Sequence, residues 1–485
     1  MSSYIKTSLL AIAALLLLGI SSCMVDDEPT GSGALVAPTV RTITAHPGEE
    51  VSIELAVQTT AGFSSLQYSV NGGDLLNVSV AVNNPTAEFT IPFLYIVPAE
   101  AFQGDIYELE FYVTDENNIL SNAAPLTINV GPRIDFPATY SFERDGVSTV
   151  SYSGQTDRLN QVAEIKAYLA TANDGATTLS SATLYAMYIN TNGNGGGNFS
   201  FTSDRQLADK TFAPDVSFYE TLFDDAQAAS EAAVAGATAT QGNAGLIARS
   251  NGNNILVDGQ GHEFTQIWEK GVMGAIFLNQ IYNVYMTDGR VGDEVNNIDL
   301  VTDKNYTAME HHWDEAFGYF GVPVDFPVDF PGAGTDEDRF WAEYTNGRDA
   351  LLNVNNNLMG AYIDGRTGIV NRDYNTRDAS RETIYATHEL VAAATAIHYL
   401  NAAQTALNNA EVGDFFHLMS EAYMFVNALR YSPVKALSNE EINTILNTNL
   451  GTDGDFWTIT NEGINTARNT IAAAYPELTS IAGSL

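Results

Sequence analysis

The stretch Leu126-Thr127-Ile128-Asn129-Val130-Gly131-Pro132 divides this 485-residue chain into two kinds of sequence. Up to Val130, apolar and polar residues alternate, which is typical of strands that bury one face. Beyond a connector at residues 131–137, apolar residues recur every three to four positions, as they do along amphipathic helices. We therefore predict a multidomain protein, with an all-β sandwich at residues 38–131 and a larger all-α helical-bundle domain at residues 138–485.

Short alternating runs fill the sequence before the connector. Apolar side chains occupy every second position from Val51 to Val57 and again from Tyr107 to Val113. Turn sequences such as Asn71-Gly72-Gly73 separate the runs. Short strands divided by turns in this way predict two packed antiparallel sheets. The pattern resembles the Ig-like or cadherin-like modules of bacterial surface proteins.

Long amphipathic runs follow the connector. Thr156 to Ala172 predicts the first helix, and His262 to Tyr285 is apolar on both sides, which predicts a helix buried all round. The runs at residues 382–406 and 414–430 predict an antiparallel pair because a short polar segment joins them.

Two Ser-x-x-Glu sequences predict the first residues of helices, and a Gly- and Asn-rich segment predicts a loop. Ser217 with Glu220, and Ser438 with Glu441, have the spacing of a capping box. The Gly- and Asn-rich residues 190–198 predict a mobile surface excursion.

The N-terminus has the features of an export sequence. Lys6 precedes an apolar run from Leu9 to Ile20, which is too short for a permanent membrane span. Ile20-Ser21-Ser22-Cys23 resembles a bacterial lipobox, and Cys23 is the only cysteine of the chain. We predict a lipoprotein signal peptide at residues 1–22, lipidation of Cys23 by acyl chains such as palmitate, and a flexible tether at residues 23–37.

The residues after Cys23 indicate where the lipoprotein is sorted. Met24 stands where an aspartate would favour retention at an inner membrane. Asp26-Asp27-Glu28 resembles the export tag of lipoproteins from Bacteroidetes-like bacteria. We expect a protein held to the outer membrane by its lipid anchor and facing the cell exterior.

The charge balance excludes one class of partner. The chain has 59 acidic and 21 basic side chains, for a formal net charge of −38. Such a surface repels nucleic acid and anionic lipid, so we expect no nucleic-acid binding. Two interpretations of the acidity stay open, namely the gathering of cations and solubility in a salt-rich habitat.

Three segments of the helical half resemble a known family. They begin at Tyr140-Ser141-Phe142-Glu143-Arg144, Glu269-Lys270-Gly271-Val272 and His311-His312-Trp313-Asp314-Glu315. Together they resemble the Bacteroidetes lipoproteins grouped as domain of unknown function 4856, over about residues 140–485. A more remote similarity links the layout to imelysin-like helical proteins, which are associated with iron handling and a Gly-x-His-x-x-Glu motif. Here Glu310 stands in place of the motif's glycine, two residues before His312.

The densest polar group lies on the helix predicted around residues 310–320. His311, His312, Asp314 and Glu315 are spaced so that imidazole and carboxylate share a helix face, which suits a divalent metal. Further ligands would come from other helices, and the candidates are His388 with Glu389 and His417 with Glu421. The alternative is structural: Trp313, Phe317 and Phe320 pack inward, while the charged residues cap, pair or meet solvent. Both interpretations stay open.

No catalytic motif accompanies this group. The chain has no His-Glu-x-x-His, no Gly-x-Ser-x-Gly and no Walker loop. We expect a non-enzymatic surface lipoprotein whose helical domain binds a ligand or partner, with iron or another divalent metal as the leading ligand. The alternatives are an imelysin-like metalloprotein or hydrolase, and a glycan-binding partner of an outer-membrane uptake receptor.

Overall fold

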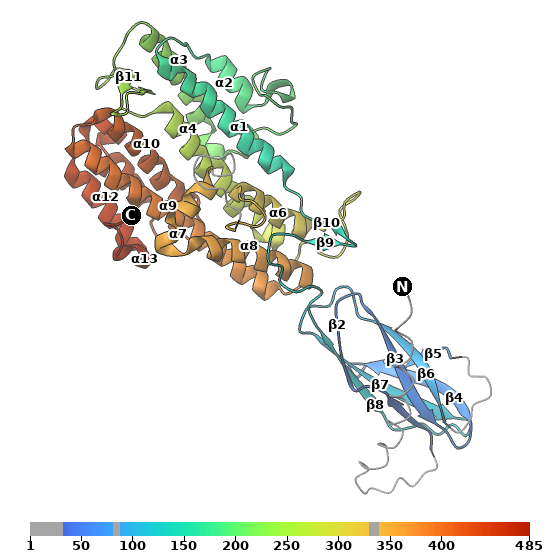
Figure 1. Ribbon diagram of the computed structural model, residues 1–485. Helices are drawn as coiled ribbons and strands as arrows, with labels where there is room; N and C mark the ends of the chain where they lie inside the picture. Colours follow the sequence, from blue (N-terminus) through green and yellow to red (C-terminus); the bar gives the residue numbers. More distant parts are fainter. Residues whose placement is uncertain (1–32, 81–87, 329–338) are drawn as a thin grey trace, which may run out of the picture. The chain divides into compact units, whose positions relative to one another are not determined.

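The computed structural model describes residues 33–80, 88–328 and 339–485 (Figure 1). The described chain divides into two compact units, one ending at Gly131 and the other beginning at Pro132. The predicted signal peptide at residues 1–22 and the lipidation site Cys23 lie outside the described residues. No helix in the described part is both long and apolar enough to cross a membrane.

The first unit is built from two β-sheets. One has the strand order β1-β3-β6 and the other β2-β8-β7-β4-β5, and β2 with β8 is the parallel pair among otherwise antiparallel neighbours. The strands are β1 (Leu35–Pro38), β2 (Thr42–Ala45), β3 (Glu50–Gln58), β4 (Phe63–Val70), β5 (Leu76–Val78), β6 (Glu88–Ile96), β7 (Ile106–Asp115) and β8 (Ala124–Val130).

The inward faces of the two sheets share one apolar core, as the alternation predicted. Ile53 and Leu55 of β3 are buried, and Phe93 of β6 meets Phe111 of β7 with ring centroids 5.0 Å apart. The sheet begins earlier than expected, because β1 starts at Leu35 inside the predicted tether of residues 23–37. Val36 faces the core, so the last residues of that tether belong to the sandwich.

The second unit is mostly helical, which confirms the two-part fold class. Its α-helices are α1 (Ser153–Ala170), α2 (Ser181–Tyr188), α3 (Val216–Val234), α4 (Phe264–Val272), α5 (Asp288–Val291), α6 (Ala308–Phe320), α7 (Trp341–Leu352), α8 (Val354–Asn371), α9 (Tyr374–Asn408), α10 (Val412–Ala428), α11 (Asn439–Thr444), α12 (Asn461–Ala474) and α13 (Pro476–Thr479). The shorter 3₁₀ and π segments are η2 (Thr171–Asp174), η3 (Thr191–Gly193), η4 (Ala208–Lys210), η5 (Ala213–Asp215), η6 (Met273–Leu278), η7 (Ile281–Tyr285), η8 (Leu429–Tyr431), η9 (Ile445–Asn449), η10 (Thr452–Gly454) and η11 (Phe456–Thr458).

A central helical segment and a long helix pair organise this unit. The run α4-η6-η7 is buried on nearly all sides, as predicted, and Trp268 and Phe277 have no exposed surface. The predicted pair is α9 and α10, which pack along each other because a short connection reverses the chain. Tyr399 of α9 stacks on Phe425 of α10 at 5.9 Å.

Of three local expectations, one is confirmed and two differ from the structure. The box at Ser438 with Glu441 is formed, but α3 begins at Val216, so Ser217 caps nothing. Residues 190–198 are folded in place, because Asn190 donates to the Ser203 carbonyl at 2.7 Å and accepts from the Gly195 N–H at 2.9 Å.

Two small hairpins also stand within the mostly helical unit. They are β9 (Glu143–Arg144) with β10 (Val147–Ser148), and β11 (Gly245–Ala248) with β12 (Asn254–Val257). Strands of two to four residues are too short to show a recognisable alternation.

Candidate functional site

The apolar face of α6 is part of the core, as the structural alternative predicted. Trp313, Phe317 and Phe320 are at most 1% exposed. The Trp313 indole N–H donates to the Tyr362 carbonyl at 2.9 Å. Gly365 of α8 makes this packing possible, since a β-carbon there would lie 2.0 Å from the Trp313 ring. This face therefore holds α6 rigidly against α8.

Glu310 lies in the first turn of α6, where its carboxylate is engaged and cannot serve as a free ligand. Its backbone N–H donates to the Thr307 hydroxyl at 3.2 Å, and its carboxylate accepts from the Thr307 N–H at 2.8 Å. Arg144 and Arg366 pair with the same carboxylate at 3.1 and 3.2 Å. The Thr307-x-x-Glu310 spacing is a capping box that could have been recognised in the sequence.

Asp314 lies in the core as part of an ion-pair network. Its carboxylate is 3.0 Å from Arg366 Nε, and it accepts from the Tyr140 hydroxyl at 2.8 Å and the Ser151 N–H at 3.1 Å. Burial raises the pKa of Asp314 to about 6, although Arg366 opposes the shift. These partners occupy the oxygens that a metal would need.

His312 and His388 each occupy a separate environment. His312 Nδ1 is 2.8 Å from the Arg290 carbonyl, and its Nε2 is 3.2 Å from the Arg290 guanidinium. His388 is fully buried beside the rings of Phe320 and Trp341, and its Nε2 is 3.1 Å from the Tyr362 hydroxyl. Burial lowers the pKa of His388 to about 3, so this side chain is a neutral core histidine.

The predicted pair His417 and Glu421 is joined by a residue that sequence reasoning missed. His417 Nδ1 lies 2.6 Å from Glu263, and its Nε2 lies 3.2 Å from Glu421. Burial opposes protonation, but hydrogen bonds to Glu263 and Glu421 raise the pKa of His417 to about 9. An imidazolium that donates from both nitrogens has no lone pair for a metal.

The predicted ligands are thus distributed over separate clusters. His311 and Glu315 lie 3.9 Å apart, one helical turn from each other. Within the residues that the structure describes, no group of three or more His, Cys, Asp or Glu side chains is arranged to hold a metal ion.

His311 and Glu315 do share a cavity, of about 320 Å³, with several basic side chains. The cavity is lined by Ser151, Tyr152, Ser153, Gly154, Gln155, Arg158, Arg205, Lys210, Tyr285, Lys304, Tyr306, His311 and Glu315. We call this site the cationic pocket, after Arg158, Arg205, Lys210 and Lys304. It collects four of the 21 basic residues of a strongly acidic chain.

Four segments that are distant in the sequence build the cationic pocket. Arg158 lies on the first turns of α1, Lys210 ends η4, and Tyr285 ends η7. Lys304 precedes α6, which supplies His311 and Glu315. At the start of α1, a β-carbon on Gly154 would lie 2.8 Å from Arg205 Nε, so Gly154 leaves room for the Arg205 side chain in this position.

Three of the four basic side chains of the pocket lack a salt-bridge partner among the described residues, whereas Arg205 pairs with Asp204 at 3.1 Å. Arg158, Lys210 and Lys304 form no salt bridge with any described residue, and Arg158 instead donates to the Gln206 and Gly154 carbonyls at 2.9 and 3.2 Å. Lys210 donates to the Tyr285 hydroxyl at 3.4 Å. Burial, followed by the nearby Arg158 charge, lowers the pKa of Lys210, although the Asp209 and Glu315 carboxylates oppose the shift. Concentrated positive charge of this kind attracts an anion.

Glu315 gives the pocket an acceptor among these donors. Its side chain is 19% exposed and accepts from Gln155 Nε2 at 3.1 Å. Burial and then the Glu315 charge raise the pKa of Tyr285, so its hydroxyl stays protonated and can donate. His311 stacks on Tyr306 with ring centroids 4.6 Å apart, and burial lowers its pKa.

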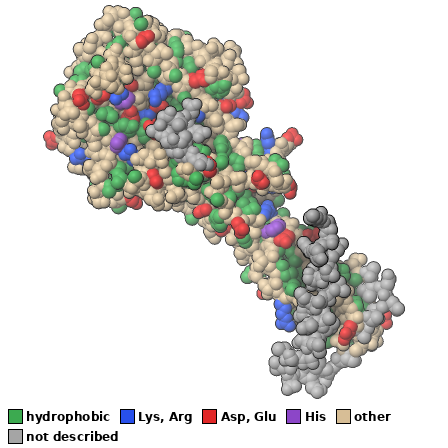
Figure 2. All heavy atoms as spheres, viewed as in Figure 1, with side chains coloured by type: hydrophobic (Ala, Val, Ile, Leu, Met, Phe, Trp, Pro, Cys, Tyr) green, Lys and Arg blue, Asp and Glu red, His purple; other side chains and the backbone are tan. Residues whose placement is uncertain are grey.

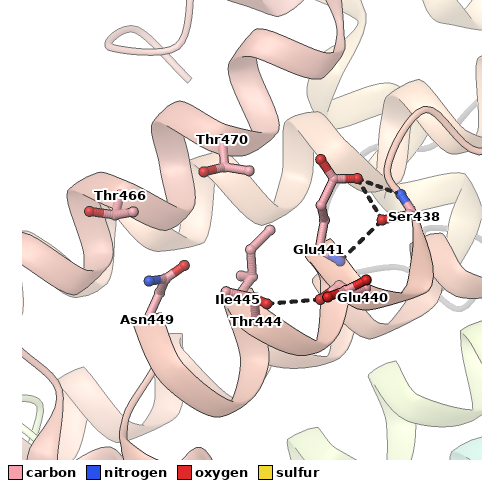
Figure 3. Close-up of a pocket in the computed structure, with 8 residues that line it drawn as sticks. All are labelled: Ser438, Glu440, Glu441, Thr444, Ile445, Asn449, Thr466 and Thr470. Carbon is pink, nitrogen blue, oxygen red and sulfur yellow. Dashed lines mark hydrogen bonds between the residues drawn. The ribbon is translucent and has the colours of Figure 1, made fainter.

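A larger hollow between α11-η9 and α12 has a different character (Figure 3). Its volume is about 540 Å³. The Glu441 carboxylate there is engaged by Ser438, and the Thr444 and Thr466 hydroxyls donate to carbonyls of their own helices. Because these polar groups are already used within the helices, we regard the cationic pocket as the stronger candidate.

A comparison with protein families finds a match over the part of the chain that contains the cationic pocket. Residues 137–477 match the family described as Domain of unknown function (DUF4856). The chain belongs to this family. The match confirms the resemblance noted in the three sequence segments, and it includes every residue of the cationic pocket. No curated protein matches the sequence.

Proposed function

We propose that this protein is a surface lipoprotein of the outer membrane whose DUF4856 region binds a small anionic ligand in the cationic pocket. The observation that carries the proposal is that Arg158, Lys210 and Lys304 line one pocket without salt-bridge partners among the described residues, in a chain of net charge −38. Figure 2 shows carboxylates scattered over the visible surface, where basic residues could find partners. Arg158 is buried and Lys210 is half-buried, and buried charges without partners cost free energy unless a ligand compensates them.

The elements around the pocket fit a binding role. The pocket is formed by the start of α1 and by α6, and the core packing of Trp313 and the capping of Glu310 fix α6 in place. Side chains on rigid elements bind with little loss of conformational entropy. The lipid anchor and the cell-surface location stay proposals that rest on the lipobox-like Ile20-Ser21-Ser22-Cys23.

Calorimetric titration of the purified full chain in mild detergent tests the binding role. Inorganic phosphate, citrate and D-glucuronate are suitable anions, and D-glucose is the neutral control. We expect at least one anion to bind, and we expect a Lys210→Gln, Lys304→Gln double variant to lose that binding. The matched control is Lys435→Gln, which removes a charge elsewhere in the same unit. Failure of every anion to bind would refute the proposal.

Mass spectrometry of the N-terminus and protease shaving of intact cells test the location. A diacylated Cys23 and cleavage of the protein on whole cells are expected. An unacylated N-terminus, or protection of the protein until cells are broken, would contradict the proposed location.

A further inference from the structure

The cationic pocket contains one carboxylate that a simple anion site would not need. Glu315 lines the pocket together with Arg158, Lys210 and Lys304, yet among the described residues its partner at salt-bridge distance is His311, at 3.9 Å, and none of these three bases. A carboxylate at this place repels an inorganic anion and weakens its binding. Glu315 therefore indicates that the ligand carries more than negative charge.

The hydrogen-bonding capacity of Glu315 shows what else the ligand must offer. A carboxylate accepts hydrogen bonds and donates none, and Gln155 and the Tyr285 hydroxyl use only part of the about four acceptor positions of Glu315. A ligand group beside Glu315 must therefore be a donor. An ammonium group could donate, but it would meet the repulsion of the four basic side chains. A neutral hydroxyl donates without that penalty.

We infer that the ligand is a polyhydroxylated carboxylic acid of about the size of one sugar acid. Its carboxylate lies against Arg158, Lys210 and Lys304, and one of its hydroxyls donates to Glu315. The inference rests on the proposed anion-binding function and specifies its ligand. The cavity of about 320 Å³ is near the lower end of the range for small-molecule sites, which fits a single sugar unit.

The test uses the purified full chain and its Glu315→Gln variant, which keeps the shape of the side chain. Calorimetry is run with D-glucuronate, D-glucose, L-glutamate and inorganic phosphate. We expect wild-type protein to bind D-glucuronate more tightly than the other three. In Glu315→Gln, D-glucuronate should bind roughly tenfold more weakly, because a charge-assisted hydrogen bond is lost. Phosphate should bind more tightly to this variant, since the repulsion is gone.

A Lys304→Gln variant separates charge from hydroxyl recognition. Lys304 is exposed, so its replacement leaves the core intact, and it should weaken D-glucuronate and phosphate alike. Lys435→Gln should change neither, and circular dichroism confirms that each variant is folded.

Different results would refute the anion-binding function and the identification of its ligand as a hydroxy acid. If phosphate binds as well as D-glucuronate, and Glu315→Gln strengthens both, the anion site stands but the hydroxy-acid inference is wrong. Tighter binding of L-glutamate than of D-glucuronate also overturns the inference, in favour of an amino acid. If none of the anions binds, the proposed function itself fails.

Discussion

Replacement of Arg366 by methionine should destabilise the helical unit strongly. Arg366 is fully buried, with Nε 3.0 Å from Asp314 and Nη1 3.2 Å from Glu310. Methionine would occupy part of the space but leave two buried carboxylates without their shared counter-charge. Breaking a buried ion pair from one side costs about 3–5 kcal/mol of the free energy of unfolding.

Arg381→Met is the matched control, because Arg381 also pairs with two carboxylates. Its partners Asp288 and Asp378 have side chains 87% and 46% exposed. Ion pairs of this kind contribute about 0–1 kcal/mol. Urea unfolding followed by tryptophan fluorescence is the assay. The four tryptophans, Trp268, Trp313, Trp341 and Trp457, all lie in the second unit, so the signal reports on that unit alone.

The pH dependence of the Arg366→Met defect gives a second readout. Burial already raises the pKa of Asp314 to about 6 beside Arg366, and removal of the guanidinium should raise it further. A carboxyl whose pKa is higher in the folded than in the unfolded state gains stability as pH falls. The defect should therefore shrink between about pH 7.5 and about pH 5.5. Equal losses in both arginine variants, or a defect independent of pH, would refute this reasoning.

Three further predictions concern the pocket, the core and the N-terminus. Anion affinity should rise as pH falls through the lowered pKa of His311, because the imidazolium adds positive charge; titration of His311→Gln should show a flatter pH profile. Gly365→Ala should lower the free energy of unfolding, measured in urea, by about 1–3 kcal/mol, because the added β-carbon would collide with the Trp313 ring. Gly347→Ala is the control, since a β-carbon there would meet no atom within 4 Å and should leave that free energy unchanged. Cys23→Ala should release the protein from membranes in a fractionation assay.

The fold class could be predicted because periodicity is a local property. Alternation in β3 and the helical spacing in α1 are present within single elements, so no knowledge of distant residues is needed. The two errors have different causes, one local and one from outside the segment. Ser217 has the spacing of a cap, but α3 already begins at Val216, and residues 190–198 are held by the distant carbonyl of Ser203.

The candidate site was only partly predictable. The spacing of His311 and Glu315 on one helix predicted that they share a site, and both residues line the pocket. The metal site inferred from them needed further ligands from other helices, and spacing within one helix gives no information on those. Glu263 is 154 residues away from His417 in the sequence, and Arg366 is 52 residues from Asp314. Pairings at such separations arise from helix packing, which a single sequence does not encode in any readable pattern.

The scarcity of basic residues relative to acidic ones links the composition of the chain to the proposed site. In a chain with 59 acidic and 21 basic side chains, a basic residue can readily find a carboxylate, as Arg366, Arg377 and Arg381 do. Arg158, Lys210 and Lys304 instead converge on one cavity without salt-bridge partners among the described residues. Their convergence differs from the pairing of bases with carboxylates elsewhere in the chain, and the proposed anion would compensate their charge. The acidic composition thus makes these basic residues informative, since in a basic protein the same cluster would not be distinctive.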